Sequence, residues 1–185
     1  RVGWDVERQG LAGAPPILLA AMQPYAWAHQ LLQTIPGIDE IAAAMILIEI
    51  GDDLSRFGTA DRLASWAALC PGNNESAGKR NSGKTRKGNT IVRYLLCEAA
   101  NAARRTKSVF ASKYNSLVIR RGHKKAIVAL AHKLIRTLFF VLTRRLPYRD
   151  SGFDYEAASV AKNAPRWIKA LKKFGLWHHA APAAA

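Results

Sequence analysis

Ser76 lies between small residues in a basic, glycine-rich stretch that runs from Cys70 to Arg93. Six basic residues follow it there: Lys79, Arg80, Lys84, Arg86, Lys87 and Arg93. A serine hydroxyl in such a setting can attack a phosphodiester, while the cations hold the phosphate and stabilise its developing charge. No histidine lies nearby in sequence to act as a base, so a hydrolase triad is not indicated. Serine in this kind of segment is more often an ordinary loop residue, and both interpretations stay open.

The same stretch contains a complete phosphate-loop pattern. Residues 78–85 read GKRNSGKT, which satisfies G-x-x-x-x-G-K-T. This pattern binds ATP or GTP where it joins a buried strand to a helix. Residues 70–75 cannot form a buried strand and residues 86–88 do not begin a helix, so we expect no nucleotide-binding loop.

A second glycine-containing turn, Ile35-Pro36-Gly37-Ile38, precedes an alanine-rich segment and resembles a helix-hairpin-helix. In that motif Gly37 would let the backbone approach a phosphate at the start of the second helix. Asp39 stands where a second glycine is usual, and with Glu40 it would repel phosphate. The alternatives are a DNA contact through Gly37 and a helical hairpin that only packs.

The charge of the chain is strongly one-sided. The net charge is +15. Residues 1–78 hold 4 basic and 9 acidic side chains, whereas residues 79–149 hold 19 basic side chains and one acidic one, Glu98. This segregation favours a nucleic-acid partner over a basic surface kept only for solubility.

The elements that position these residues are predicted to be helices, so the expected fold is mainly α. Helices are expected at 25–34, 40–50, 60–69, 90–105, 107–121, 123–145, 154–161 and 166–174. Thr59 and Asn89 are the expected N-caps of the third and fourth. Residues 71–88 are expected to form a long basic loop, and no strand pattern is evident. We expect an irregular lead-in or the end of an upstream element at 1–24, one helical domain at 25–175 and a disordered tail at 176–185.

The remaining composition indicates an intracellular, cytoplasmic protein with no membrane span. Cys70 and Cys97 form no paired motif for a disulfide framework or a metal. The apolar run 126–142 is interrupted by charged residues and is expected to be a core helix. Arg1 stands where Met is usual, so we expect a fragment of a longer protein.

The ordered set of short motifs resembles the transposases of the insertion-sequence "one-ten / one-sixteen / nine-oh-two" family, from about Leu31 to Phe174. The motifs are IPGI at 35–38, EIGD at 49–52, RF at 56–57, the apolar helix 63–69, SAGK at 76–79, KGN at 87–89 with Arg93, Tyr114 before RG at 121–122, KA at 125–126, YRD at 148–150 and DY at 154–155.

The resemblance implies a C-terminal transposase domain that acts in DNA transposition, with Ser76 as the nucleophile that becomes linked to DNA. Ser82 is a weaker candidate, and Glu75 occupies a slot where some relatives carry a second hydroxyl. The implied nucleic-acid contacts are Lys79, Arg80, Lys84, Arg86, Lys87, Asn89 and Arg93. Gly37 is a further candidate contact because it lies in the turn that resembles a helix-hairpin-helix.

The implied partners are DNA, a guide noncoding RNA and further copies of the chain. The family also carries an upstream RuvC-like nuclease domain in which four acidic residues bind Mg²⁺. This chain begins after that point, so we expect no metal or other cofactor here and an incomplete enzyme. The alternative is a non-catalytic nucleic-acid-binding remnant.

Overall fold

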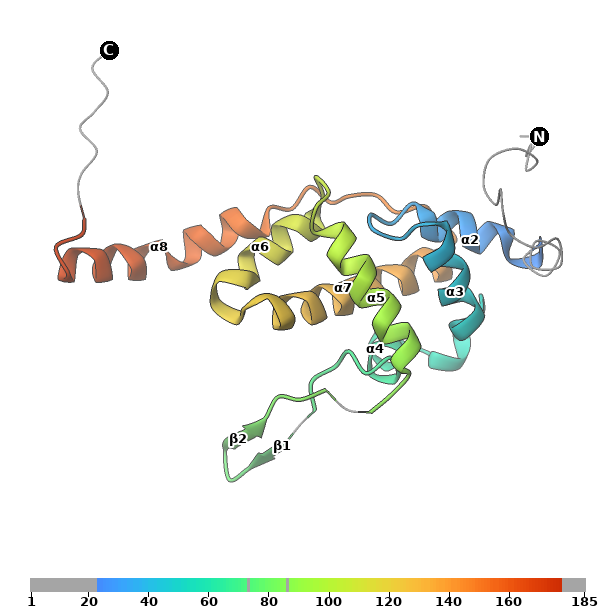
Figure 1. Cartoon of the computed structure of the whole chain (residues 1–185), viewed down its shortest axis with the longest axis horizontal. Helices are drawn as coiled ribbons and strands as arrows, with labels where there is room; N and C mark the ends of the chain where they lie inside the picture. The colour runs from blue at the N-terminus through green and yellow to red at the C-terminus, as the bar shows by residue number, and fades with distance from the viewer. Residues whose placement is uncertain (1–22, 73, 86, 178–185) are drawn as a thin grey trace, which may run out of the picture.

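The computed structural model describes residues 23–72, 74–85 and 87–177, and of residues 74, 75 and 80–82 the backbone alone. The elements in these ranges are η1 Gln23–Tyr25, α2 Ala26–Gln33, α3 Glu40–Ile50, η2 Ser55–Phe57, α4 Ala60–Trp66, β1 Asn74–Ser76, β2 Lys79–Ser82, α5 Thr90–Ala103, α6 Val109–Arg121, α7 His123–Arg144 and α8 Tyr155–Lys173. The prediction of a mainly α fold is confirmed (Figure 1). Of the expected lead-in at 1–24 and tail at 176–185, residues 1–22 and 178–185 lie outside the described residues, while Gln23 and Pro24 belong to η1.

α7 is the central helix and packs against α2, α4, α5 and α6. Its buried residues recur at helical spacing over one broad face: Ala126, Ile127, Leu130, Ala131, Leu134, Ile135, Leu138, Phe139, Val141 and Leu142. Among the described helices it alone has the length and apolar composition of a membrane span. Because this apolar face packs against the other helices, core packing accounts for the composition, as the sequence predicted.

Two helices, α4 and α5, begin at the side-chain caps that the sequence predicted. The Thr59 hydroxyl accepts a hydrogen bond from the Arg62 amide and begins α4. The Asn89 side-chain oxygen accepts one from the Val92 amide and begins α5. Both caps satisfy an amide that has no partner within its helix.

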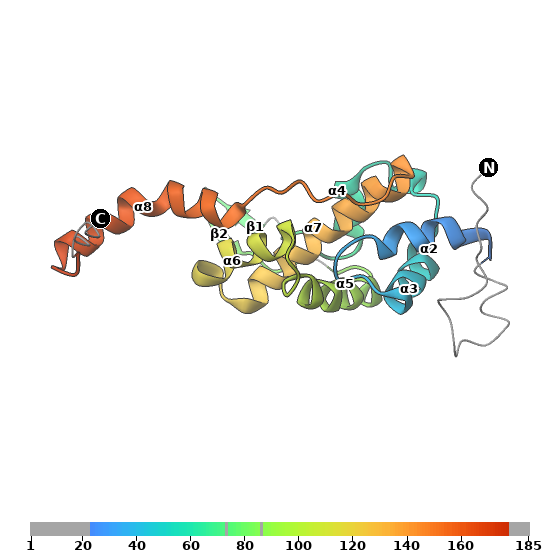
Figure 2. The same cartoon turned by 90° about the horizontal axis from the view of Figure 1, so that it is seen from above.

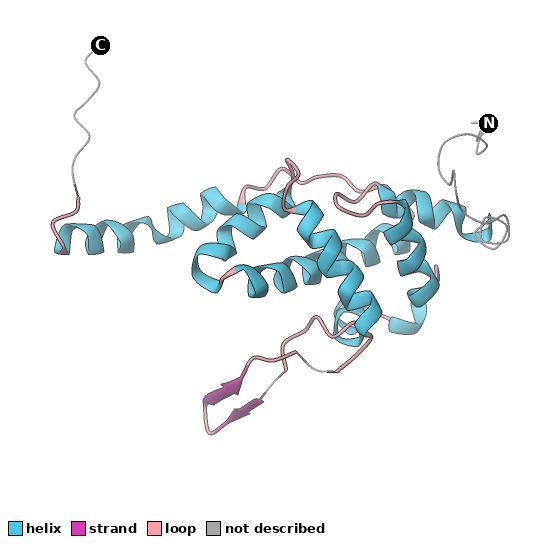
Figure 3. Cartoon of the chain, viewed as in Figure 1, coloured by secondary structure: helices cyan, strands magenta, loops and turns pink. Residues whose placement is uncertain are grey.

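The predicted long loop at 71–88 is wrong in one respect, because its middle forms a β-hairpin that projects from the helical body (Figure 3). β1 and β2 pair antiparallel, with Ser76 opposite Lys79. The strands are short and polar, so they lack the apolar alternation by which strands are recognised in sequence.

The C-terminal region also differs from the prediction of two short helices. One helix, α8, continues through Pro165. Proline costs a helical hydrogen bond, but in an exposed helix the freed carbonyl can bind water, so the helix continues. α8 contacts α6, has no buried residues and extends away from the body (Figures 1 and 2).

The start of α8 is tied to the body by polar contacts. The Tyr155 ring lies 4.5 Å from the Nζ atom of Lys113 and 4.5 Å from that of Lys133. The Asp154 carboxylate caps the helix and accepts a hydrogen bond from the Ser112 hydroxyl at 2.8 Å. Cation–π contacts and a shared cap therefore fix this end.

Candidate nucleic-acid interface

Ser76 lies at the tip of the β-hairpin, which closes through the two-residue turn Ala77-Gly78. Both turn residues have positive φ, 48° at Ala77 and 75° at Gly78, as a tight hairpin turn requires. Ser76 and Lys79 flank the turn as directly opposed partners. Opposed residues of a hairpin present their side chains on the same face, so the Ser76 and Lys79 side chains leave the hairpin on one face.

The tip is open to solvent. Ser76, Lys79 and both turn residues are exposed. A Cβ placed on Gly78 would meet no atom within 4 Å. A nucleic-acid strand can therefore reach the serine hydroxyl without displacing any described part of the protein.

The base of the hairpin, in contrast, is fixed to the body. The Gly72 amide donates to the Lys84 carbonyl at 2.8 Å, and Pro71 forms an isolated bridge with Thr85. The Arg93 guanidinium donates to the Thr85 hydroxyl at 2.8 Å. These contacts hold the two ends of the hairpin together beside α5.

Asn89 connects the segment after the hairpin to two helices. Its side-chain NH₂ group donates to the Glu49 carboxylate on α3 at 2.7 Å, while its oxygen caps α5. Its backbone amide donates to the Trp66 carbonyl at the end of α4, at 3.0 Å. The structure therefore places Asn89 as a junction of α3, α4 and α5, and its role as a nucleic-acid contact stays a prediction.

A basic groove with a volume of about 800 Å³ opens beside the hairpin base. Its cations are Lys84, Arg93, Lys113, Arg121, Lys124 and Lys125. Four of these, Lys113, Arg121, Lys124 and Lys125, were not among the predicted contacts. They come from α6 and α7, so only the one-sided charge of residues 79–149 signalled them in the sequence.

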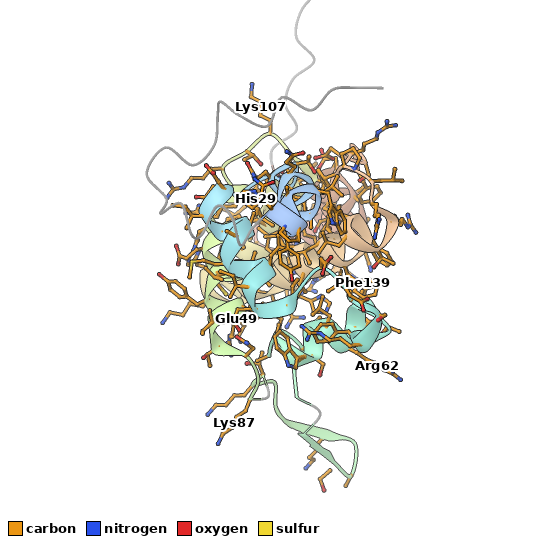
Figure 4. All side chains as sticks on the ribbon, turned by 90° about the vertical axis from the view of Figure 1, so that its right-hand side faces the viewer. His29, Glu49, Arg62, Lys87, Lys107 and Phe139 are labelled. Atoms are coloured by element: carbon orange, nitrogen blue, oxygen red, sulfur yellow. The ribbon has the colours of Figure 1, made fainter. Side chains whose placement is uncertain are left out.

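The remaining predicted contacts are spread over the same end of the molecule. Lys87 is exposed and points away from the body (Figure 4). Lys79 lies at the hairpin tip, while Lys84 and Arg93 line the groove. Arg86 and the side chain of Arg80 lie outside what the structure describes.

The turn between α2 and α3 is packed into the protein. A Cβ on Gly37 would overlap the Ala99 carbonyl oxygen and would lie 2.7 Å from the Ala103 amide nitrogen, both on α5. The Asp39 carboxylate accepts a hydrogen bond from the Ala42 amide at 2.8 Å, where a phosphate at this helix start would bind. The close approach that Gly37 permits is thus to α5, and its contact with nucleic acid stays a prediction.

Other chemistries find little support near the groove. Burial raises the pKa of the thiols of Cys70 and Cys97, which disfavours a reactive thiolate. Within the described ranges no three His, Cys, Asp or Glu side chains converge as metal ligands. The phosphate-loop pattern falls on the turn and β2, and α5 begins only at Thr90, so the strand-to-helix arrangement that binds ATP is missing from the described part of 78–90.

Known proteins resemble this chain over most of these elements. Residues 29–115 match the family model described as "Transposase IS116/IS110/IS902 family". The transposase for insertion sequence element IS1111A of Coxiella burnetii is 32% identical over 125 residues, which is 65% of this chain and 34% of that protein. A probable family 20 transposase of Pseudomonas aeruginosa is 32% identical over 125 residues, covering 65% of this chain and 37% of that protein.

A third relative, an uncharacterised insertion element IS110 protein of Streptomyces coelicolor, is 32% identical over 140 residues, 72% of this chain and 32% of that protein. The chain thus spans about a third of the length of these curated relatives. The family match contains the α2–α3 turn, the β-hairpin with Ser76, and α5. Over these residues the chain is similar to transposases of the IS116/IS110/IS902 family.

Proposed function

We propose that this chain is the DNA-binding, serine-nucleophile domain of a transposase, which takes part in DNA strand cleavage and exchange. The observation that carries the proposal is the pairing of Ser76 with Lys79 at the exposed tip of the β-hairpin. The hydroxyl supplies a nucleophile, and the neighbouring ammonium group supplies a positive charge for the phosphate under attack.

In the proposed step the Ser76 Oγ atom attacks a DNA phosphorus atom. The new Oγ–P bond replaces the bond from phosphorus to one deoxyribose oxygen, which leaves as a free hydroxyl after taking up a proton. The serine gives up its own proton, and strand exchange reverses the step with a hydroxyl of another strand. Lys79 stabilises the additional negative charge on the phosphate oxygens in the transition state.

The basic side chains around the hairpin would hold the DNA backbone on both sides of this step. Lys87 and the cations of the groove lie at the same end of the body as the hairpin. Contacts of this kind fix the position of the strand and carry no sequence information themselves. Choice of target is then left to another component, for which the family resemblance implies a guide noncoding RNA.

The complete enzyme would need parts beyond the described residues. The resemblance implies an upstream RuvC-like domain that binds Mg²⁺ through acidic residues, and assembly into a homo-oligomer. The described residues do not fit a metal, because no three ligand side chains lie together. No step is therefore assigned to a metal within this chain.

The decisive experiment compares Ser76→Ala with Ser82→Ala in the transposase completed by its nuclease domain. Ser76→Ala should lower strand exchange by at least about a thousandfold and abolish the covalent protein–DNA product on a denaturing gel. DNA binding should persist. Ser82→Ala is the matched control and should retain activity. Full activity of Ser76→Ala would disprove the assignment of the nucleophile.

The alternative function is a nucleic-acid-binding module without chemistry, favoured by the groove and its six cations. In that case Ser76→Ala would change neither nucleic-acid binding nor any other measured property. Joint replacement of Lys79, Lys84 and Lys87 by glutamine would remove binding in both cases. Only the combination of retained binding and lost exchange in Ser76→Ala identifies the enzyme.

A further inference from the structure

The groove beside the hairpin base combines a cationic rim with an apolar floor. Its rim carries six cations, and no carboxylate is among its lining residues within the described part of the chain. Its floor is apolar and includes Leu69, Leu117, Val128 and Ala129. The volume of about 800 Å³ is within the range of pockets that enclose small organic ligands.

The rim predicts an anionic ligand. Arg121, Lys124 and Lys125 are exposed around the junction of α6 and α7, and Lys113 projects from the preceding turns of α6. Arg93 is held towards the groove by its hydrogen bond to Thr85. So many like charges around one concavity repel one another, and a bound polyanion relieves that repulsion.

The floor predicts that the ligand is also flat and apolar over part of its surface. Leu117 and Val128 are half-buried and pack against the core, so the floor is part of the packed helical body. A DNA duplex offers a protein surface mainly phosphates and sugars, which gain nothing from an apolar concavity. An unpaired base has a face that packs on apolar side chains and an edge that forms hydrogen bonds.

His132 adds a polar group suited to a base edge. It lines the groove and is half-buried. Burial, aided by the nearby Arg136, lowers the pKa of His132, so the ring is neutral at physiological pH. A neutral imidazole has one hydrogen-bond donor and one acceptor, as base edges do.

We propose that this groove binds an unpaired nucleotide of a nucleic-acid strand, with its base on the Leu117–Val128 floor and its phosphates on the cationic rim. The proposal rests on the proposed function, because it assigns a place to one part of the strand on which Ser76 acts. β2 spans four residues between the groove and the tip, about 13 Å of extended chain. The groove therefore holds a nucleotide a short distance along the strand from the attacked phosphate.

Binding measurements on the full chain carrying Ser76→Ala test this proposal without any chemistry. The probes are a short fluorescein-labelled DNA single strand, the same strand without bases, the corresponding duplex and the corresponding RNA strand. The base-bearing single strand should bind about tenfold more tightly than the abasic strand. Comparison of the DNA and RNA strands identifies which nucleic acid supplies the nucleotide.

Floor variants separate the base from the phosphates. Val128→Thr keeps the shape of the side chain but makes the floor polar, and Leu117→Asn is the stronger change. Both should abolish the preference for the base-bearing strand while leaving affinity for the abasic strand unchanged. Thermal melting verifies that each variant folds. If Leu117→Asn does not fold, Val128→Thr alone provides the test.

Rim variants test the phosphate contacts. Joint replacement of Lys124 and Lys125 by glutamine should reduce the slope of log affinity against log salt by about two. The matched control, glutamine at Lys162 and Lys169 on α8, removes the same charge from residues that do not line the groove and should leave the slope nearly unchanged. Equimolar adenosine monophosphate should not displace the strand, because a free nucleotide lacks the adjoining phosphates.

Several outcomes would overturn the proposal. These are equal affinity for base-bearing and abasic strands, floor variants that do not change the preference, and displacement by equimolar nucleotide. The proposed function would survive each of them, because Ser76 and its activity are measured separately. Absence of any nucleic-acid binding would instead overturn both.

Discussion

Gly37 and Gly78 each have a left-handed conformation in a hairpin turn, and they differ in what surrounds them. Gly37, between α2 and α3, has φ of 90° and lies against the backbone of α5. Gly78, between β1 and β2, has φ of 75° and has open space around it. The first turn joins helices in the core, while the second presents residues to solvent.

The polar residues beside each turn follow the same division. Asp39 uses its carboxylate to cap α3 within the protein. Ser76 and Lys79 lie exposed on one face of the β-hairpin. A glycine turn with basic or hydroxyl neighbours therefore indicates a binding surface only where its surroundings are open, and sequence similarity to a motif does not reveal this.

The largest expected difference between the two turns is in stability. Gly37→Ala should lower the free energy of unfolding by about 3–5 kcal/mol, because it adds backbone strain and overlaps α5. Gly78→Ala is the matched control, with the same strain and no overlap, and should cost about 1 kcal/mol. Urea denaturation followed by far-UV circular dichroism measures both. Equal losses would contradict the packing described for Gly37.

The connection between the two regions passes through Asn89, whose replacement should have the next largest effect. Asn89→Ala removes the cap of α5 and the donor to Glu49, and should cost about 1–2 kcal/mol in the same assay. Asn89→Ser retains a capping oxygen and should recover roughly half of that loss. No recovery with serine would mean that the contact with Glu49 dominates.

Acid should weaken the helical body through Asp150, which stabilises the connection from α7 to α8. Burial alone raises the pKa of this carboxyl, but hydrogen bonds from the Val109 and Gly152 amides outweigh it and lower the pKa. A folded-state pKa below the unfolded value gives stability that is present above about pH 4 and is lost as pH falls through the folded pKa.

Asp150→Asn tests this dependence. The difference in melting temperature between pH 7 and pH 3 should be smaller in Asp150→Asn than in the parent chain, because the titrating group is gone. The same difference in both proteins would show that Asp150 contributes nothing to acid sensitivity.

The smallest effect on stability is expected at the β-hairpin tip, where Lys79→Gln should change the free energy of unfolding by less than about 0.5 kcal/mol. Its effect should appear in DNA binding, as a reduction of about one in the salt slope. Lys107→Gln is the matched control, since Lys107 lies at the opposite end of the body from Lys87 (Figure 4). A similar reduction in both variants would indicate binding by overall charge alone.

The helices were predictable because their signals are local. Thr59 and Asn89 cap α4 and α5 through their own neighbouring amides, and the apolar spacing of α7 marks its buried face. The β-hairpin was not predictable from the sequence. Its turn has Ala77 where asparagine or aspartate is usual, and its strands have no apolar face to bury.

The candidate site was predictable in part for the same reason. Ser76 and Lys79 are close in sequence and were both recognised there, but their pairing depends on a turn that the sequence did not predict. The groove joins cations from the hairpin base, α5, α6 and α7, which are distant in sequence. Only the packing of α6 and α5 on α7 brings them together, and that packing depends on long-range contacts that a pattern of residues does not specify.

The central position of α7 also sets the order in which the chain can acquire its structure during synthesis. α2, α4 and α5 each bury apolar residues against a helix that ends at Arg144. Until that residue has left the ribosome, α2, α4 and α5 lack the α7 surface, and the contacts of α3 with α2 and α5 cover only part of the core. We therefore expect the nascent chain to stay open, and prone to association, until synthesis has passed α7, after which the core can form in a single step.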